Sequence, residues 1–468
     1  MAWYVIGAEV GSSIAHCARA HRMCLHQPQL APPMNSLNSP QIPFVPHRPL
    51  AASDHRTLAL AALGGALEFY DFVIYVFFAT AIGQLFFPPT IPDWLRQLQT
   101  FGIFAAGYLA RPLGGVILAH FGDLVGRKRM FTLSVMLMAL PTLLMGLLPT
   151  FGAIGIAAPV LLLVCRVLQG AAVGGEVPGA WVFVSEHVPP RYIGYACGLL
   201  TGGLTFGILL GSLIASGVNH HYSHAEIAAY AWRIPFVIGG LFGILSAFLR
   251  RWLEETPVFV EMKARRSLAT EVPLKTVLRE HGRAVIVSML LTWTLTAAIV
   301  VVILMTPTLV AKRFHIDPVT TLQANSAATL CLCVGCVVAG SLAGRIGTRR
   351  TIFAGCLLLG ASYLAMLRHL AADPGALLPL YAVAGFFVGA VAAIPVAMVN
   401  AFPPAVRFSG ISFSYNVAYA VFGGLTPVFV SLMLKWNPSA PELYVAALSV
   451  IGALTSLALP RASTAAAK

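Results

Sequence analysis

The sequence predicts an all-α integral membrane protein with twelve transmembrane helices in two six-helix, pseudo-symmetric halves. Three observations support this fold class: a lipid-compatible composition, a succession of apolar stretches long enough to cross a bilayer, and an internal repeat. Of the 468 residues, 58% are hydrophobic and only 10% are charged, whereas soluble domains carry roughly 25% charged residues. The composition therefore excludes an ordinary soluble domain.

Apolar stretches of about 20 residues can cross ~30 Å of hydrocarbon at ~1.5 Å per residue. Twelve such stretches follow one another along the chain, too many for the buried helices of one soluble core. We expect transmembrane helices at 57–86, 97–121, 130–149, 153–185, 192–217, 232–250, 284–311, 322–343, 350–369, 376–401, 408–434 and 442–459. The predicted domains are a tail at 1–56, bundles at 57–250 and 284–459, a cytoplasmic linker at 251–283 and a tail at 460–468.

The first 33 residues differ from the rest of the chain. They have no charged run before their short apolar stretch, which argues against a signal peptide. Met34 then opens a polar, Pro-rich segment of the kind expected before a first membrane helix. We expect translation to start at Met34, with residues 1–33 an upstream extension; the alternative is a disordered N-terminal tail.

The net charge of +13 is distributed unevenly between the expected loops. With a cytoplasmic N-terminus, the inner loops hold Arg127, Lys128, Arg129, Arg191, Arg250, Arg251, Arg345, Arg349, Arg350, Arg407 and the basic linker. The outer loops hold only Arg96, Arg233, Lys312, Arg313, Arg368 and Lys435. This asymmetry follows the positive-inside rule. It predicts a bacterial inner-membrane protein with both termini in the cytoplasm, and it argues against a nucleic-acid partner.

Neither a metal site nor an enzymatic centre is expected. Six of the eight cysteines lie in apolar segments, where cysteine behaves as a small hydrophobe. Cys331, Cys333 and Cys336 are close in sequence but have no second ligand pair and no neighbouring His. No nucleophile and base occur together near a helix end, so we predict no cofactor and no enzyme activity.

An internal repeat relates the two halves. The segment AHFGDLVGRKRM (119–130) aligns with GSLAGRIGTRRT (340–351) at a constant offset of 221 residues. The aligned pairs are Gly126 with Gly347, Lys128 with Arg349 and Arg129 with Arg350. Parallel halves of this kind can rock about a central site and expose it to alternate sides of the membrane.

Five segments together resemble a known family. GDLVGRKR resembles the loop signature of the major facilitator superfamily. The segments LEFYDFVIY, ARPLGG, RVLQGAAVGGEVPGA and FPPAVRFSGISFSYNVAYAVFGGLTP resemble its metabolite:proton symporter branch. The resemblance covers about 57–459 and implies a monomeric, proton-driven, twelve-helix transporter. The branch includes carriers of oxoglutarate, citrate, shikimate and proline or betaine.

Two carboxylates lie within the first expected helix. Glu68 and Asp71 are three residues apart and share a helix face. Counted from Thr57, Asp71 lies about 21 Å along the helix, near mid-membrane. An ionised side chain there costs on the order of 2.5–3.5 kcal/mol, so these groups should face a partner or a watery cavity. We predict that Asp71, with Glu68 beside it, binds the coupled proton.

Two arginines reach the same depth from the second and fourth expected helices. We predict that Arg166 pairs with Asp71 and that Arg111 is a second cation in or near the cavity. The alternative is a structural Asp71–Arg166 pair that only fixes two helices together. Glu176 lies about 15 Å beyond Arg166, and it is either a second proton site or a packing residue among glycines.

The basic inner loop is predicted to form a cytoplasmic gate. In the resembled family, the Asp and Arg of this loop hold the inner helix ends together while the carrier faces outward. The matching residues are Asp123 and Arg127, within a signature completed by Gly126 and Lys128. We expect Glu186, at the inner end of the fourth helix, to pair with Arg127. The alternative is that these basic residues only determine topology.

The sequence departs from the family pattern at this gate. Leu124 replaces the usual basic residue, and the second copy has Gly344 and Thr348 in place of Asp and Arg. The gate should therefore depend mainly on the N-terminal half.

The substrate is predicted only by class. Two buried arginines suit a carboxylate, because a guanidinium can bind it with two hydrogen bonds. Tyr415 and Asn416 are the polar candidates on the eleventh helix, and aromatic residues could hold the cation of a betaine. The segment after Pro460 has no heptad repeat, which disfavours an osmosensing domain. We therefore place uptake of a small organic carboxylate first and a zwitterionic osmolyte second.

Other function classes remain open at this point. An exporter or passive facilitator could use the same fold, and a sensor without transport activity would fit the weakened second loop. Ile208 stands where an antiporter motif needs Pro after the second of three glycines, which favours uptake by symport over efflux.

Overall fold

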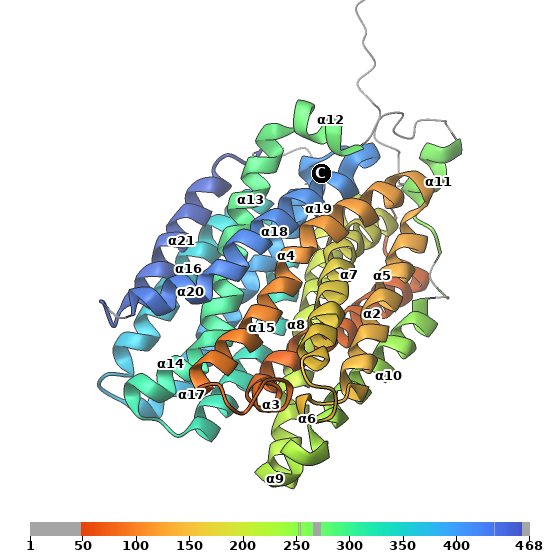
Figure 1. Ribbon diagram of the computed structural model, residues 1–468. Helices are drawn as coiled ribbons and strands as arrows, with labels where there is room; N and C mark the ends of the chain where they lie inside the picture. Colours follow the sequence, from red (N-terminus) through yellow and green to blue (C-terminus); the bar gives the residue numbers. More distant parts are fainter. Residues whose placement is uncertain (1–47, 251, 253, 265–272, 435, 461–468) are drawn as a thin grey trace, which may run out of the picture. The chain divides into compact units, whose positions relative to one another are not determined.

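The computed structural model describes residues 48–250, 252, 254–264, 273–434 and 436–460, and all regular structure within them is helical (Figure 1). Ten helical segments in this part of the chain are long and apolar enough to cross a membrane. The segments Arg407–Met433 and Ala440–Ser456 complete the twelve. Residues 1–47 of the predicted N-terminal tail, with the expected start at Met34, and residues 461–468 of the predicted C-terminal tail lie outside the described residues.

The N-terminal half contains six spans and short connecting helices. Its helices are α2 (Ala52–Phe77), α3 (Ala79–Phe86), α4 (Asp93–Val125), α5 (Arg127–Leu147), α6 (Phe151–Ile154), α7 (Ala157–His187), α8 (Ile193–His221), α9 (His224–Glu226) and α10 (Arg233–Arg250). A 3₁₀ turn at Pro190–Tyr192 and a π-helical turn at Ile227–Ala231 precede α8 and α10.

The linker carries α11 (Pro257–Ala264) and α12 (Pro273–Glu280). The C-terminal helices are α13 (Gly282–Ala297), α14 (Thr306–Phe314), α15 (Pro318–Ile346), α16 (Thr348–His369), α17 (Leu377–Val388), α18 (Ala393–Ala401), α19 (Arg407–Ala418), α20 (Gly424–Met433) and α21 (Ala440–Ser456). Distorted turns join several of them: π-helical η3 (Ala298–Met305) and η7 (Tyr419–Gly423), and 3₁₀ turns η4 (Pro374–Ala376), η5 (Gly389–Ala392) and η6 (Pro404–Val406).

The first span begins earlier than the sequence predicted. Helix α2 starts at Ala52 rather than at 57, because the Asp54 carboxylate accepts a hydrogen bond from the Ala51 N–H (2.8 Å) and pairs with Arg48. A carboxylate in the first turn satisfies a backbone donor that the helix itself leaves unpaired. The span is then interrupted at Phe78, so the expected helix 57–86 is two helices.

The repeat is visible in the backbone. Gly126 and Gly347, which the sequence aligned, both adopt positive φ, at 133° and 94°. Only glycine tolerates this conformation without strain. The equivalent loops of the two halves therefore turn in the same unusual way, although their side chains differ.

Glycines let the two halves approach closely along α8 and α15. A Cβ atom at Gly194 would lie 2.3 Å from the Gly340 carbonyl oxygen, and a Cβ at Gly340 would lie 2.4 Å from the Gly194 oxygen. Small residues at such crossings allow backbone contact between membrane helices. We call the end of the bundle with α11, α12 and the Gly126 and Gly347 loops the basic end; the halves are closed against each other near it.

Candidate functional site

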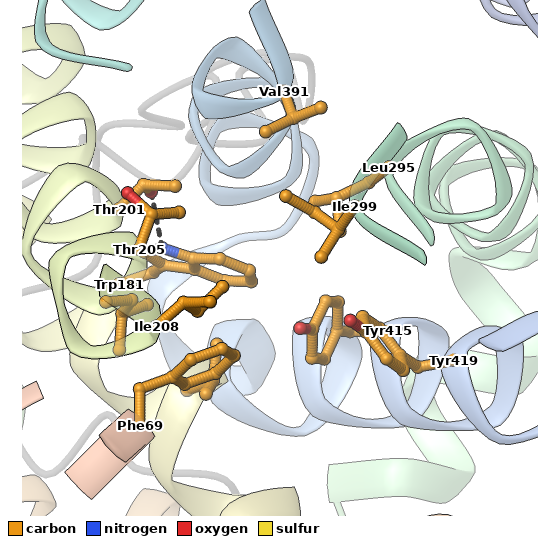
Figure 2. A pocket seen from close by; sticks show the side chains of 12 residues that line it. Phe69, Trp181, Thr201, Thr205, Ile208, Leu295, Ile299, Val391, Tyr415 and Tyr419 are labelled. Carbon is orange, nitrogen blue, oxygen red and sulfur yellow. Dashed lines mark hydrogen bonds between the residues drawn. The ribbon is translucent and has the colours of Figure 1, made fainter. Parts of the chain in front are cut away.

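A small cavity of about 40 Å³ lies between the halves (Figure 2). Four aromatic side chains form much of its wall: Phe69, Trp181, Tyr415 and Tyr419. Thr201 and Thr205 of α8 add hydroxyl groups, and the other lining residues are aliphatic. No described residue that lines the space is charged. The space can thus accept an apolar or cationic group but holds no charge of its own.

The aromatic wall is held in place by contacts across the halves. Trp181 of α7 lies edge-on to Tyr415 of α19, with ring centroids 5.1 Å apart. The indole Nε1 donates to Thr201 Oγ1 at 3.2 Å. Tyr415 also packs against Tyr419 at 5.1 Å. These rings present π faces from both halves to one space, an arrangement suited to cation–π binding.

A second space adjoins the first and shares Phe69 and Tyr419 with it. Its further aromatic lining is Phe72, Phe104 and Tyr108. These three rings form an interlocked cluster, with centroid distances of 4.9–5.8 Å. The cluster packs against the two predicted arginines, Arg111 and Arg166.

Arg111 is buried behind these rings, with 1% of its surface exposed. Its guanidinium carbon lies 4.7 Å from the centre of Phe72, 4.4 Å from Tyr108 and 4.6 Å from Tyr419. None of its three side-chain nitrogens has a hydrogen-bond partner among the described residues. Because unpaired buried donors are costly, such a cation can bind an anionic group that reaches it.

Arg166 shares the same ring cluster and is fully buried. Its guanidinium lies over Phe72 at 4.7 Å and over Tyr75 at 4.5 Å. Nη1 donates to Gln169 Oε1 at 2.7 Å and approaches the Phe72 carbonyl at 3.5 Å. Nε and Nη2 have no partner in the described part of the chain. Two cations therefore face Phe72, and neither lines the open space.

The predicted contact between Asp71 and Arg166 is absent from the structure. Both oxygens of Asp71 lack a hydrogen-bond partner among the described residues. The carboxyl group instead faces α10, where Cβ atoms at Gly239 and Gly243 would lie 2.6 Å and 3.2 Å from its oxygens. Successive residues on a helix point about 100° apart. Phe72 faces the arginines, so its neighbour Asp71 turns towards another helix.

The other predicted proton sites are also buried. Glu68, 1% exposed, shares the α10 face with Asp71 and accepts a hydrogen bond from Ser246 at 2.6 Å. Glu176 is 2% exposed on α7, two residues before the internal Pro178.

The two candidates on α19 have different positions. Tyr415 lines the space, whereas Asn416 does not. The Asn416 amide donates to the Gly174 carbonyl of α7 at 2.6 Å and to Ser412 O at 2.8 Å. A Cβ atom at Gly115 of α4 would lie 2.3 Å from the same amide nitrogen. In this conformation Asn416 ties three helices together rather than facing a substrate.

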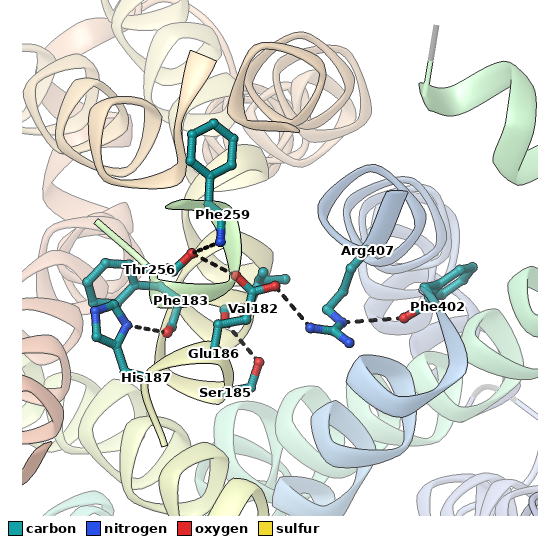
Figure 3. Close-up of polar contacts among 9 residues, drawn as sticks. All are labelled: Val182, Phe183, Ser185, Glu186, His187, Thr256, Phe259, Phe402 and Arg407. Atoms are coloured by element: carbon teal, nitrogen blue, oxygen red, sulfur yellow. Dashed lines mark hydrogen bonds and ion pairs between the residues drawn. The ribbon is translucent and has the colours of Figure 1, made fainter. Parts of the chain in front are cut away.

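At the basic end, Glu186 joins three parts of the chain (Figure 3). Its Oε1 accepts from Arg407 Nη1 of α19 at 2.9 Å, and its Oε2 accepts from Thr256 Oγ1 of the linker at 2.9 Å. The Arg127 side chain, which we expected as its partner, lies outside the described residues. Arg407 is a partner that the sequence did not suggest.

Asp123 provides a second link across the halves. Its Oδ2 accepts from the backbone N–H of Ser409 at 3.0 Å and from its hydroxyl at 2.8 Å. Ser409 lies in the first turn of α19, where a negative charge also interacts favourably with the helix dipole. The loop itself contacts the linker, since Glu255 accepts from the Lys128 backbone N–H at 3.2 Å.

Sequence reasoning missed Gln169, Thr142 and the Phe72 ring cluster. Gln169 follows Arg166 by three residues, a spacing that places both on one helix face. A buried amide in an apolar helix could therefore have been found. The cluster could not, because apolar aromatics are common throughout membrane helices. Two further tyrosines of α2 are bonded elsewhere: Tyr70 donates to Pro235 O and Tyr75 to Thr100 O, and neither lines the two spaces.

A family model described as Major Facilitator Superfamily matches residues 72–427. The chain belongs to the major facilitator superfamily. This confirms the resemblance noted from the motifs and the twelve-helix fold class, and it identifies a multi-pass membrane transporter rather than an enzyme.

Similar proteins with curated names include bacterial transporters. A protein of Staphylococcus aureus (strain COL), named as a candidate proline/betaine transporter, is 31% identical over 411 residues, covering 85% of this chain and 86% of that protein. The proline/betaine transporter of Escherichia coli (strain K12) is 29% identical over 419 residues, covering 86% and 83%.

Solved superfamily structures share the fold. The proton:xylose symporter XylE, bound to 6-bromo-6-deoxy-D-glucose, matches with a TM-score of 0.71 at 16% identity, covering 86% of this chain and 94% of that one. The human organic anion transporter MFSD10 matches with a TM-score of 0.62 at 16% identity, covering 88% and 100%.

Proposed function

We propose that this superfamily member takes up a small zwitterion of the proline or betaine type together with a proton, by alternating access. The observation that carries the proposal is the uncharged aromatic space between the halves, next to two buried guanidinium groups with free donors. The names of its bacterial relatives support the same substrate class.

The two regions suit the two ends of a zwitterion. Phe69, Trp181, Tyr415 and Tyr419 can surround a quaternary or secondary ammonium group, each close contact contributing roughly 0.5–2 kcal/mol. A carboxylate can bind a guanidinium with two charge-assisted hydrogen bonds. Rotation of Phe72 or Tyr419 would open Arg111 to the space, because these rings separate them.

A small di- or tricarboxylate is the second candidate. The presence of two adjacent cations, Arg111 and Arg166, favours it, since a single carboxylate needs only one. The aromatic wall favours the zwitterion, because a second carboxylate would gain nothing from π faces. Competition between labelled betaine and unlabelled oxoglutarate or citrate separates the two candidates directly.

The basic end is proposed to face the cytoplasm, in accordance with the distribution of Lys and Arg. The Glu186–Arg407 and Asp123–Ser409 contacts would then close the cytoplasmic side. On this assignment the conformation is closed to the cytoplasm, and release of substrate requires these contacts to break. We place the transporter in the bacterial plasma membrane, functional as a monomer because one chain supplies both halves of the site.

Asp71 is the proposed proton-binding group, with Glu68 and Glu176 as further candidates. It is buried, lies on the helix that also lines the substrate space, and has free oxygens. Uptake of labelled betaine into proteoliposomes, with and without an inward proton gradient, tests the proposal. We expect accumulation above the external concentration only with the gradient; uptake that equilibrates with or without the gradient would make the protein a facilitator.

A further inference from the structure

A row of buried hydrogen bonds runs from Arg166 towards Asp71. Arg166 Nη1 donates to Gln169 Oε1 at 2.7 Å, Gln169 Nε2 donates to Thr142 Oγ1 at 2.5 Å, and Thr142 Oγ1 donates to Met138 O at 3.0 Å. The three side chains of the row are fully buried. Every donor points the same way, from the guanidinium of α7 to the hydroxyl of α5.

The far end of this row lies beside the free carboxyl group of Asp71. A Cβ atom at Gly239 would lie 2.6 Å from Asp71 Oδ1 and 2.9 Å from Thr142 Cγ2. The two side chains thus share the space that the missing side chain of Gly239 leaves. Asp71 has no hydrogen-bond partner among the described residues, and the Thr142 atom nearest this space is its methyl carbon. A turn of the Thr142 side chain about χ1 would exchange methyl and hydroxyl and bring the donor to this side.

We propose that Thr142 and Gln169 are positioning residues that connect Asp71 to Arg166. When Asp71 releases its proton to water on the open side, the Thr142 side chain turns about χ1, so that its hydroxyl leaves Met138 O and donates to the carboxylate. The Gln169 amide follows the Thr142 oxygen, so a row of donors then joins guanidinium and carboxylate. The pairing that the sequence suggested is then made through two intermediates instead of directly. This inference rests on the proposed proton coupling.

We call the row from Arg166 through Gln169 and Thr142 to Asp71 the bridge. It stabilises the ionised form of Asp71, which would otherwise be an unpaired buried carboxylate. An unpaired ionised group in a buried site is strongly disfavoured, while aligned hydrogen bonds in a low-dielectric interior polarise one another. The charge of Arg166 therefore stabilises ionised Asp71 at a distance. Because Arg166 also lies over Phe72, loss of the Asp71 proton is transmitted to the rings next to the substrate space.

The surroundings of Asp71 offer few competing groups. Among the described residues, the titratable neighbours on α2 are Glu68 and Tyr70. Glu68 accepts a hydrogen bond from Ser246, and Tyr70 donates to Pro235 O. Arg166 of α7 and Arg111 of α4 lie over Phe72, on another side of α2 from Asp71. Helices α5 and α10 face Asp71 with Ala139, Thr142, Gly239 and Gly243, none of which titrates. A change at Thr142 should therefore act on Asp71 through the hydroxyl.

The test compares Thr142→Val, Thr142→Ser and Gln169→Leu with the control Thr329→Val in reconstituted full-length protein. Thr329 is equally buried and also donates to the carbonyl four residues before it, Asn325 O at 2.8 Å. Gradient-driven betaine uptake is measured as a function of pH, and betaine exchange is measured at equal concentrations on both sides. Exchange does not require the proton to leave, so it separates proton release from folding and substrate binding.

We expect Thr142→Val and Gln169→Leu to retain exchange and to show reduced net uptake at neutral pH, with the alkaline limb of the uptake profile moved up by about one pH unit, the scale of one hydrogen bond to a charge. Removing a donor from the carboxylate makes proton release need a higher pH. Thr142→Ser keeps the hydroxyl group and should therefore show the wild-type pH profile of uptake. Thr329→Val should show it as well.

Two outcomes contradict the proposal, and they are distinguishable. If wild-type protein shows proton-driven uptake that Asp71→Asn abolishes, but Thr142→Val leaves the pH profile unmoved, the bridge is wrong and the proposed function stands. If wild-type protein shows no proton-driven uptake, the proposed function fails and the bridge with it.

Discussion

The two halves of the transporter share a repeat, but they bury different chemistry. Buried charged residues of the described N-terminal half are Asp54, Glu68, Asp71, Arg111, Asp123, Arg166, Glu176 and Glu186. In the described C-terminal half the corresponding set is Glu442 alone. The C-terminal half instead buries hydroxyl and amide groups.

Neutral side chains of the C-terminal half form hydrogen bonds with the backbone of a distorted helix. The Tyr381 hydroxyl lies 2.5 Å from Val302 O and 2.6 Å from Asn325 Oδ1, and Thr306 Oγ1 donates to Val301 O at 2.8 Å. These carbonyls belong to the π-helical turn η3, where regular helical pairing is interrupted. The comparison suggests a division of roles: charge for proton and substrate binding in one half, neutral support for a bent helix in the other.

The largest effect is expected from a change at Asp71, a buried charge of the N-terminal half. Asp71→Asn should abolish accumulation of betaine above equilibrium, because the amide cannot bind and release the coupled proton. Glu442→Gln is the matched control in the C-terminal half, since Glu442 is 3% exposed and pairs with Arg313 at 2.6 Å. It should lower thermal stability and leave proton coupling intact. Loss of coupling in Glu442→Gln but not in Asp71→Asn would reverse our assignment.

A second prediction concerns the buried cation with free donors. Arg111→Gln should raise the KM for betaine by about ten- to a hundredfold, because a charge-assisted hydrogen bond contributes roughly 1.5–3 kcal/mol. Arg313→Gln, which changes the partly exposed partner of Glu442 in the C-terminal half, serves as the control. An unchanged KM in Arg111→Gln would remove this arginine from the substrate site.

The aromatic wall gives a third prediction, which distinguishes the substrate classes. Trp181→Leu should raise the KM for betaine by roughly tenfold, on the scale of one or two cation–π contacts. The KM for any transported carboxylate without an ammonium group should change much less. Equal effects on both substrates would favour the dicarboxylate candidate, with Trp181 acting only in packing.

The contact that joins the halves at the basic end should have a smaller effect. Glu186→Gln weakens the link to Arg407 and to Thr256, so the proposed cytoplasmic side should open more often. We expect a cysteine placed at Ser185 to react faster with a membrane-impermeant thiol reagent in inverted vesicles when Glu186→Gln is present. An unchanged labelling rate would show that this contact does not control opening.

The smallest effect is expected for the neutral network of the C-terminal half. Tyr381→Phe removes one buried hydroxyl and should lower the free energy of unfolding by about 1–3 kcal/mol, measured by thermal unfolding in detergent. Its betaine KM and its pH profile should match wild type. A shifted pH profile would show that proton coupling extends into the C-terminal half.

Several features of the site were accessible from sequence because they depend on position along a helix. The common face of Glu68 and Asp71 followed from residue spacing. The Gly126–Gly347 equivalence followed from the repeat. Arg111 and Arg166 were identified as buried cations from their place within apolar stretches. Each of these statements concerns one helix or one loop at a time.

Partners were harder to predict than positions. Asp71 faces Gly239 instead of Arg166, Asn416 holds α7 instead of lining the space, and Glu186 binds Arg407 from the other half. A rotation of one residue changes the direction of a side chain by about 100°. Apolar membrane helices give little sequence signal for that rotation, because lipid and neighbouring helices are similarly apolar.

The sequence by itself determined the class of protein, the twelve spans and the residues that carry buried charge. It could do so because the bilayer is a uniform solvent, which requires each spanning segment to be apolar and to satisfy its own backbone hydrogen bonds. The tertiary structure alone decided which helix faces meet. Close packing at glycines such as Gly194, Gly239 and Gly340 brings helix faces together, and the contact of α5 with α7 allows the row of hydrogen bonds from Arg166 to Thr142.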